Sequence, residues 1–291
     1  MRLVTFQVKQ TGVIGAGYVT ESDNVVVCAE GSGADSAIIS LIEKDGVNAW
    51  LSEGLACPEL PLSDVNLLAP IPKPIRNIFC VGKNYYAHAL EFHGSGFDSN
   101  KEDVPSSPII FSKATTSVCG PGDDVLGSLD PTDSVDYEGE LGVVIGREAF
   151  QISKAEAMDY IFGYMNINDV TSRELQKKHN QWLIGKGLNT FCPMGPWILT
   201  ADEVGDVRDL KLQTTVNGEL RQDASVSDLI FDIPTLIETL SQTMTLLPGD
   251  IIATGTPVGV GIGFSPPKYL ASGDTVTVSI TGLGELTNQI K

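Results

Sequence analysis

Residues 136–147 read DYEGELGVVIGR, a run of three acids that passes directly into an apolar segment. Residues 141–145 are apolar and are followed by a glycine, a pattern that predicts a short buried strand. Side chains two apart on a strand share one face, so the three acids are expected to point the same way. Gly139 leaves the opposite face bare, which predicts the close approach of another element.

Three like charges beside an apolar core cost several kcal/mol unless something neutralises them. A divalent cation does so, because carboxylate oxygens and water are the ligands that Mg²⁺, Mn²⁺ and Ca²⁺ prefer. A further acid, Asp169, ends another apolar run two residues before the predicted helix cap at Thr171. We predict a metal site on Glu138, Glu140 and Asp169. The alternative is an acidic strand end that faces solvent.

Strand patterns predominate along the chain, and the predicted helices are short. Three prolines within residues 70–74 cannot donate ladder hydrogen bonds and predict an extended linker. We therefore predict an α+β fold, mainly β, with a small N-terminal α+β domain at residues 1–70 and a larger domain at residues 71–291. The absence of a strict strand–helix repeat argues against a doubly wound sheet.

Local patterns predict the individual elements. Helices are expected at residues 34–45, 84–93, 155–160, 171–178 (opened by a capping box, TSRE) and 233–247. Strands are expected at residues 2–6, 24–28, 75–81, 141–145, 161–167 and 274–280. A hairpin is expected over residues 210–222, with a two-residue turn at Asn217 and Gly218. Residues 94–108 are expected to form a long surface loop.

Composition narrows the classes of partner. The formal charge is −18, from 19 basic and 37 acidic side chains, and such a balance repels nucleic acid. Five dispersed cysteines without a C-x-x-C pair indicate reduced thiols in a cytoplasmic compartment. Residues 1–12 carry no secretory signal pattern. No apolar stretch approaches the roughly 18 residues that span a bilayer, so we expect a soluble protein with no membrane partner.

Two further patterns carry candidate catalytic groups. His88 and Glu91 lie three apart on a predicted helix, where a carboxylate can orient an imidazole as a general base. Lys186 stands between Gly185 and Gly187, and glycines allow a backbone to approach a ligand closely. The alternatives are a His–Glu pair on the surface and a lysine in an ordinary turn.

Residues 251–261, IIATGTPVGVG, are a predicted strand that enters a glycine-rich loop. The loop matches neither the P-loop nor the dinucleotide-binding fingerprint, because the spacing of the glycines differs and no Lys-Ser/Thr pair follows. Its backbone N–H groups are candidates for holding a small carboxylate. The alternative is a tight loop without a ligand.

The order of these motifs along the chain strongly resembles the fumarylacetoacetate hydrolase family. The segments that carry the resemblance are VGKNYYAHALE (81–91), DYEGELGVVIGR (136–147), GYMNINDVTSRELQ (163–176), GKGLNTFCPMGP (185–196) and PGDIIATGTPVGVG (248–261). The likeness covers roughly residues 71–291. Residues 1–70 are similar to the small N-terminal domain of many bacterial-type members.

The resemblance implies a β-rich fold, usually a homodimer, with one Mg²⁺ or Mn²⁺ in each subunit and Ca²⁺ as a substitute in crystals. By position it implies metal ligands at Glu138, Glu140 and Asp169. It implies a catalytic set of His88, Glu91 and Lys186, with the first two on a lid. It implies substrate contacts at Lys83, Tyr85, Arg173, Gln176 and Thr254. Lys83 departs from the Arg or Leu of many relatives.

The implied reaction is hydrolytic cleavage of a carbon–carbon bond in a 2,4-dioxo acid, of the acylpyruvate or fumarylpyruvate type, through a pyruvate enolate that the metal stabilises. Two other reactions need the same site: decarboxylation of oxaloacetate and isomerisation of a 2-hydroxy-dienoate. The partner in each case is a small 2-oxo acid. A remote alternative is a cation-stabilised binding protein without catalysis.

Overall fold

The computed structural model describes residues 1–43, 57–92 and 104–291. Within them, a large sheet runs in the order β4-β3-β2-β1-β14-β12-β11-β17-β6-β7, while β5 pairs with β1 and β8 with β14. Its strands are β1 (Arg2–Val8), β2 (Ile14–Val19), β3 (Asn24–Glu30), β4 (Glu59–Pro61), β5 (Val65–Leu67), β6 (Ile78–Gly82), β7 (Ile109–Lys113), β8 (Val118–Cys119), β11 (Gly139–Ile145), β12 (Ile161–Asn168), β14 (Cys192–Thr200) and β17 (Ile251–Ala253).

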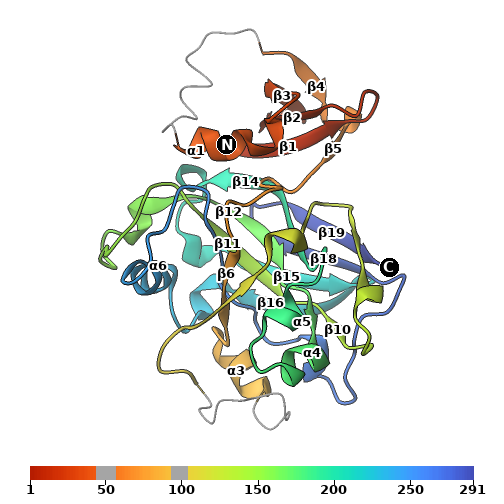
Figure 1. The fold of residues 1–291 in the computed structure, drawn as a ribbon, viewed down its shortest axis with the longest axis vertical. Coiled ribbons are helices and arrows are strands. Elements are labelled where there is room, and N and C mark those ends of the chain that lie inside the picture. Colours follow the sequence, from red (N-terminus) through yellow and green to blue (C-terminus); the bar gives the residue numbers. More distant parts are fainter. Residues whose placement is uncertain (44–56, 93–103) are drawn as a thin grey trace.

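A second sheet has the order β16-β15-β18-β19-β9, and β10 pairs with β13. These strands are β9 (Asp124–Val125), β10 (Val135–Asp136), β13 (Thr171–Ser172), β15 (Lys211–Val216), β16 (Glu219–Ser225), β18 (Thr275–Ile280) and β19 (Glu285–Ile290). The helices are α1 (Ala37–Glu43), α3 (Tyr86–Phe92), α4 (Arg173–Lys178), α5 (Leu183–Lys186) and α6 (Ile233–Ser241). The predicted α+β fold, mainly β, is confirmed (Figure 1).

The N-terminal strands, at the top of Figure 1, continue the main sheet. β1 pairs with β14 through Arg2↔Leu199 and Leu3↔Ile198. The proline segment carries no helix or strand, yet Ile71 within it is buried, and the Thr5 hydroxyl donates to Pro70 O at 2.8 Å. The segment is therefore packed against its neighbours, and the boundary at residue 70 stays a prediction.

The hydrophobic core positions the strand that the acidic motif enters. Every residue of β11 is buried, as its apolar run predicts. Helix α6 packs Leu236 and Leu240 into the same cluster as Val143 of β11. The helix ends at Ser241 and not at residue 247, because the Ser241 carbonyl accepts a hydrogen bond from Gln151 N–H and the chain turns away.

The predicted hairpin is confirmed as β15 and β16. Asn217 and Gly218 have φ values of 52° and 79°, the two positive angles that a type I′ turn requires. Other boundaries differ: α3 begins at Tyr86, the helix near residue 155 is a 3₁₀ turn at Ala157–Tyr160, and the first predicted helix is a 3₁₀ turn followed by α1. Most of the predicted loop at residues 94–108 lies outside the described residues.

The capping box that was predicted to open α4 is wrong. Thr171 belongs to β13, and its hydroxyl donates to Asp169 O at 2.9 Å. The N-cap residue is Ser172, whose side chain makes no capping hydrogen bond; the first-turn N–H of Glu174 donates instead to Ser134 Oγ at 3.0 Å. A long-range partner therefore replaces the local cap.

The close approach predicted at Gly139 is confirmed. A Cβ atom on this residue would overlap Thr214 Oγ1 of β15, and the next contacts are Gln222 Oε1 at 3.2 Å and Val278 Cγ1 at 3.3 Å. The two sheets thus pack closely where the acidic motif passes between them.

Gly139→Ala is expected to lower the free energy of unfolding by about 1–3 kcal/mol, because the methyl group overpacks a buried contact. Thr214 Oγ1 has no hydrogen-bond partner among the described residues. Adding Thr214→Ala should therefore restore much of the loss. Urea unfolding of both variants measures this, and equal stability of the single and double variants would contradict it.

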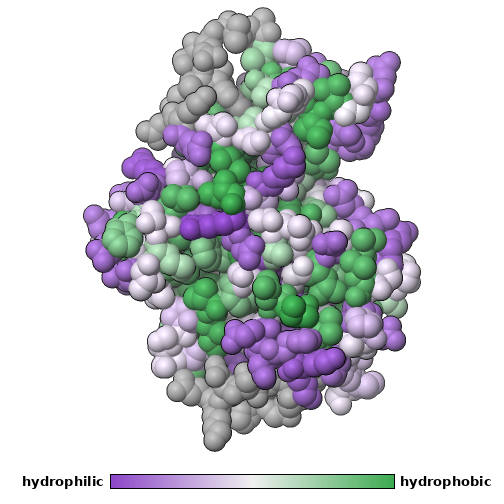
Figure 2. Space-filling model, in the orientation of Figure 1, coloured by the Kyte–Doolittle hydropathy of each residue, from purple (hydrophilic) through white to green (hydrophobic). Residues whose placement is uncertain are grey.

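Hydrophilic and hydrophobic residues are interspersed on the face of the molecule that Figure 2 shows. Among the described residues, no helix combines the length and the apolar character needed to cross a bilayer.

Candidate functional site

Three buried carboxylates meet where β11 begins and the paired strand β12 ends. Glu138, Glu140 and Asp169 each offer an oxygen, and these atoms lie within 4.8 Å of one another. Strand pairing brings them together, because Gly139 of β11 lies opposite Asn168 of β12. The Asp169 N–H donates to Glu138 O at 2.8 Å, and the Glu138 N–H donates to Asn168 Oδ1 at 3.0 Å. The predicted set is therefore one cluster.

Buried cations surround two of the carboxylates. Lys186 Nζ lies 2.7 Å from Glu138 Oε2 and 2.8 Å from Asp169 Oδ2. Lys113 Nζ lies 2.6 Å from Asp169 Oδ1, and Arg173 Nη1 lies 2.6 Å from Glu138 Oε1. Burial alone would raise the pKa of Glu138, but the Lys186 and Arg173 charges outweigh it and lower the pKa to about 2.

Glu140 has a different environment. Burial raises the pKa of its carboxyl well above the ordinary value, and the charges of Asp169 and Glu138 raise it further. Its Oε2 accepts one hydrogen bond from Gly255 N–H at 2.9 Å. This clustered negative charge, made only of hard oxygen ligands, fits Mg²⁺ or Mn²⁺. The donor set of the chain therefore suits a divalent cation.

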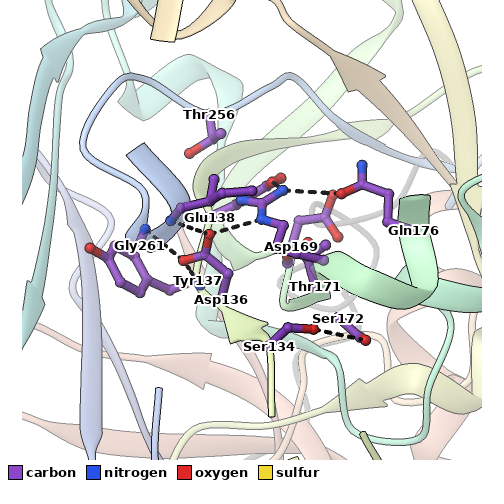
Figure 3. Close-up of polar contacts among 12 residues, drawn as sticks. Ser134, Asp136, Tyr137, Glu138, Asp169, Thr171, Ser172, Gln176, Thr256 and Gly261 are labelled. Atoms are coloured by element: carbon purple, nitrogen blue, oxygen red, sulfur yellow. Dashed lines mark hydrogen bonds and ion pairs between the residues drawn. The ribbon is translucent and has the colours of Figure 1, made fainter. Parts of the chain in front are cut away.

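The predicted grouping of Asp136 with the two glutamates is wrong. The strand is interrupted at residues 137–138, so Asp136 belongs to β10 while β11 begins at Gly139. Asp136 accepts from Arg173 Nε at 2.8 Å and from Gly261 N–H at 2.7 Å. Figure 3 shows Asp136 directed to Gly261, apart from Asp169. Asp136 anchors Arg173 instead of joining the cluster.

Lys186 is the last residue of α5 and is buried, so it is not an ordinary turn lysine. Its flanking glycines have a different purpose from the one predicted. A Cβ on Gly185 would lie 2.5 Å from Gln176 N and 2.7 Å from Ser172 O. Gly185 therefore permits α5 to pack on α4, and it is this packing, not contact with a ligand, that requires a glycine.

His88 and Glu91 form a pair on α3 in which His88 is buried and Glu91 is largely buried. His88 Nδ1 lies 3.0 Å from Glu91 Oε2, and the two side chains are 5% and 11% exposed. Glu91 Oε1 also accepts from Gly259 N–H at 3.2 Å. The glycine-rich loop therefore holds the carboxylate that orients the imidazole, and the surface-pair alternative is excluded.

Gly263→Ala is expected to lower kcat roughly tenfold to a hundredfold without weakening metal binding, since small displacements of catalytic groups have effects of this size. A Cβ on Gly263 would overlap Glu91 Oε1, so the carboxylate must move and His88 loses its orienting partner. Steady-state kinetics together with a metal titration measures both. An unchanged kcat would contradict the orienting role of Glu91.

The glycine-rich loop binds carboxylates of the protein itself. Its N–H groups donate as follows: Gly255 to Glu140, Gly259 to Glu91, and Gly261 and Ile262 to Asp136. The prediction that these groups hold a small ligand carboxylate is therefore wrong for these four donors. The loop instead connects Glu140 of the carboxylate cluster to Glu91 of α3.

A small cavity opens beside the carboxylates, with a volume of about 30 Å³. It is lined by Val81, Gly82, Lys83, His88, Phe111, Glu138, Glu140, Arg173, Gln176, Trp182, Lys186 and Thr256. Three predicted substrate contacts, Lys83, Arg173 and Gln176, are thus at the cavity together with His88 and Lys186. The cavity lining is rich in cationic groups.

Two other predicted contacts lie elsewhere. The Thr254 hydroxyl donates to Leu141 O at 3.0 Å, and the threonine that lines the cavity is Thr256. Tyr85 is 2% exposed and outside the cavity lining. Burial raises the pKa of the Tyr85 hydroxyl, and the Glu140 charge raises it further.

Lys113, Phe111 and Trp182 are among the residues at the site that were not predicted. Lys113 is a single charged residue at the end of β7, after an apolar run. In the sequence, this pattern is the same as that of a strand whose end faces solvent. Phe111 and Trp182 form an edge-to-face pair with ring centroids 5.0 Å apart, and Lys186 Nζ lies 5.0 Å from the Phe111 centroid. The positions of these two aromatic residues in the sequence gave no indication that they line the cavity.

Comparison with known proteins agrees with this geometry. Residues 77–291 match the family described as fumarylacetoacetate (FAA) hydrolase C-terminal. The chain belongs to the fumarylacetoacetate hydrolase family. The predicted family is thereby confirmed, and the buried carboxylates support a metal-dependent enzyme of this family.

Named relatives within the family include several activities. The chain is 53% identical over 229 residues to the oxaloacetate tautomerase YisK of Bacillus subtilis (strain 168), covering 79% of this chain and 74% of the relative. A fumarylacetoacetate hydrolase structure from Exiguobacterium antarcticum is 37% identical, with a TM-score of 0.81 and 99% of both chains covered. The structure of maleylpyruvate hydrolase from Sphingobium sp. SYK-6 with manganese(II) and pyruvate is 32% identical, with a TM-score of 0.78, covering 100% and 98%.

Proposed function

We propose that this enzyme interconverts the keto and enol forms of oxaloacetate, with Mg²⁺ or Mn²⁺ on Glu138, Glu140 and Asp169. The observation that carries the proposal is one small cavity, lined by two of these carboxylates, Glu138 and Glu140, together with His88 of the His88–Glu91 pair and cationic side chains. The oxaloacetate tautomerase of Bacillus subtilis, at 53% identity, supports the choice of substrate.

The cationic lining fits a dicarboxylate. Lys83, Arg173 and Lys186 all line the cavity, and hydrogen bonds between such cations and carboxylates are shorter and stronger than those between neutral groups. Arg173 is held by Asp136 and Glu138, so its guanidinium is fixed before substrate arrives. A divalent cation on the carboxylates would polarise the 2-oxo group as a Lewis acid.

His88 is the group that we assign to proton transfer. Its Nδ1 is paired with Glu91, and we assign to Nε2 the exchange of a proton at C3 of the substrate. Lys186 Nζ donates to the C2 oxygen as negative charge develops there. In the direction of enol formation, a proton leaves C3 for His88, the C2 oxygen takes a proton from solvent, and His88 then returns its proton to solvent. The reverse direction returns both.

A second candidate is hydrolysis of a 2,4-dioxo acid. The Sphingobium hydrolase structure, which holds manganese and pyruvate, favours it because pyruvate is the shared product fragment of acylpyruvate cleavage. The same His88 would take a proton from water, which attacks the distal carbonyl. Decarboxylation of oxaloacetate and isomerisation of a 2-hydroxy-dienoate would use the same side chains without the attacking water.

Enol oxaloacetate, acetylpyruvate and fumarylpyruvate distinguish these reactions. The proposal expects accelerated loss of enol absorbance with Mg²⁺ or Mn²⁺, suppression by EDTA, and no pyruvate from either acylpyruvate by mass spectrometry. Pyruvate release at a higher kcat/KM than the tautomerisation would replace the first candidate by the second. Pyruvate from oxaloacetate alone would identify a decarboxylase.

We also propose a cytoplasmic homodimer, as the family resemblance implies. Size-exclusion chromatography with light scattering tests the assembly, and a mass equal to one chain would contradict it.

A further inference from the structure

Two cysteines lie opposite each other at the edge of the main sheet. β3 and β4 pair in antiparallel register through Asn24↔Pro61, Val25↔Leu60 and Val26↔Glu59. The ladder continues past the last of these pairs, because Val27 N–H donates to Pro58 O at 2.9 Å. One step further, the register places Cys28 directly opposite Cys57.

The geometry of this position suits a covalent bond between the two thiols. Val27 and Pro58 share a hydrogen bond, so the next pair is of the non-hydrogen-bonded kind, in which opposed Cα atoms lie about 4.5 Å apart. Disulfides span Cα separations of about 4.4–6.8 Å. Cys28 is also the extra residue of a bulge, but the bulge is against β2, between Ala16 and Gly17.

Both thiols are on one face of the sheet. Asn24 Nδ2 donates to Glu59 Oε2 at 3.2 Å, which shows the face that alternate residues of the two strands share. Val25 and Val27 are buried in the N-terminal core on the other face. Burial and, to a smaller extent, the adjacent Cys57 thiol together raise the pKa of Cys28 to about 12, which agrees with contact between the two side chains.

We propose that Cys28 and Cys57 form a reversible disulfide that fastens the edge strand β4 to β3. β4 needs such a fastening, because it is the outermost strand of its end of the sheet and has three residues. Pro58 and Pro61 lack the N–H that a ladder requires. The bond closes a loop from residue 28 to residue 57. It lowers the conformational entropy of the unfolded chain and thereby stabilises the folded state.

The bond forms by exchange with a small disulfide such as glutathione disulfide. A thiolate of the pair attacks one sulfur of the oxidant and releases one glutathione thiol. The second cysteine then attacks the mixed disulfide and releases the other glutathione. The protein loses two electrons and two protons, and the oxidant gains both as two thiols. Both cysteines are partly exposed, so the oxidant can reach them.

The remaining cysteines provide internal controls. Cys80, Cys119 and Cys192 are buried, and the Cys119 thiol donates to Thr190 O at 3.2 Å. In the native protein these thiols should not exchange. β3 and β4 are also far from the helices α3, α4 and α5 at the site, so the state of the bond should not alter catalysis (Figure 1).

The test treats the native, reduced protein with glutathione disulfide, followed by peptide mapping and thermal unfolding. We expect a linked peptide containing Cys28 and Cys57, and a melting temperature about 5 °C higher that dithiothreitol reverses. Cys28→Ser and Cys57→Ser should each abolish both effects, and Cys119→Ser should retain them. Stable glutathione adducts without the link, a link through another cysteine, or an unchanged melting temperature in the linked protein would overturn the proposal.

Discussion

Glu140→Gln is expected to abolish detectable metal binding and to lower kcat/KM about a thousandfold, since a metal contributes several kcal/mol of transition-state stabilisation. The same variant should melt no lower than the wild-type protein when both are free of metal. Burial and the charges of Asp169 and Glu138 raise the pKa of Glu140, which means that its charged form is disfavoured in the fold. An amide of the same size removes that penalty and can keep the hydrogen bond from Gly255 N–H.

Calorimetric metal titration and thermal unfolding measure the two halves of this prediction. Glu148→Gln is the matched control, because Glu148 is exposed, lies just beyond the same strand and is outside the cavity lining. It should leave metal affinity and kcat/KM unchanged. Retention of metal affinity in Glu140→Gln would remove Glu140 from the ligand set.

His88→Asn is expected to lower kcat by roughly 10²–10⁴-fold, the contribution of a positioned proton-transfer group, with metal affinity retained. The imidazole is nearly buried, paired to Glu91 and part of the cavity lining. Asparagine keeps a polar side chain but cannot exchange a proton near neutral pH. Glu91→Gln should give a smaller loss, because it removes the orienting charge and leaves the base.

His179→Asn provides the control for this variant, since His179 is exposed at the end of α4. Its kcat should match the wild-type value. A His88→Asn enzyme with wild-type kcat would show that proton transfer at C3 uses another group, and Lys186 would then be the next residue to test.

The carboxylate cluster could be predicted because its signal is local. Glu138 and Glu140 flank one glycine at the entrance to an apolar strand, and Asp169 is an isolated acid at the end of another strand. The error at Asp136 has a physical cause. The strand is interrupted after this residue, so its side chain points elsewhere and accepts a hydrogen bond from Arg173 of α4. Strand alternation holds only within one unbroken strand.

What the sequence could not provide depends on long-range contacts. Lys113 reaches Asp169 only because β6 and β7 place it there, and Glu174 is capped by Ser134, which is 40 residues away. The pairing of β1 with β14 brings together Arg2 and Leu199, which are 197 residues apart. Such contacts arise from tertiary packing, and they cannot be predicted from the periodicity of charge or hydropathy along the sequence. His88, Lys186 and Arg173 were nevertheless expected at the site because the family resemblance implies it.

The central claim is that the carboxylate cluster holds a cation that a 2-oxo acid contacts in the same cavity. Titration calorimetry of the metal-free protein with Mn²⁺, with and without saturating oxalate as an enolpyruvate mimic, tests it most directly. We predict one Mn²⁺ for each chain and an affinity at least about tenfold higher with oxalate. A protein that binds no Mn²⁺, or binds it equally well with and without oxalate, would contradict the claim, and the latter result would point to a cation-stabilised binding protein.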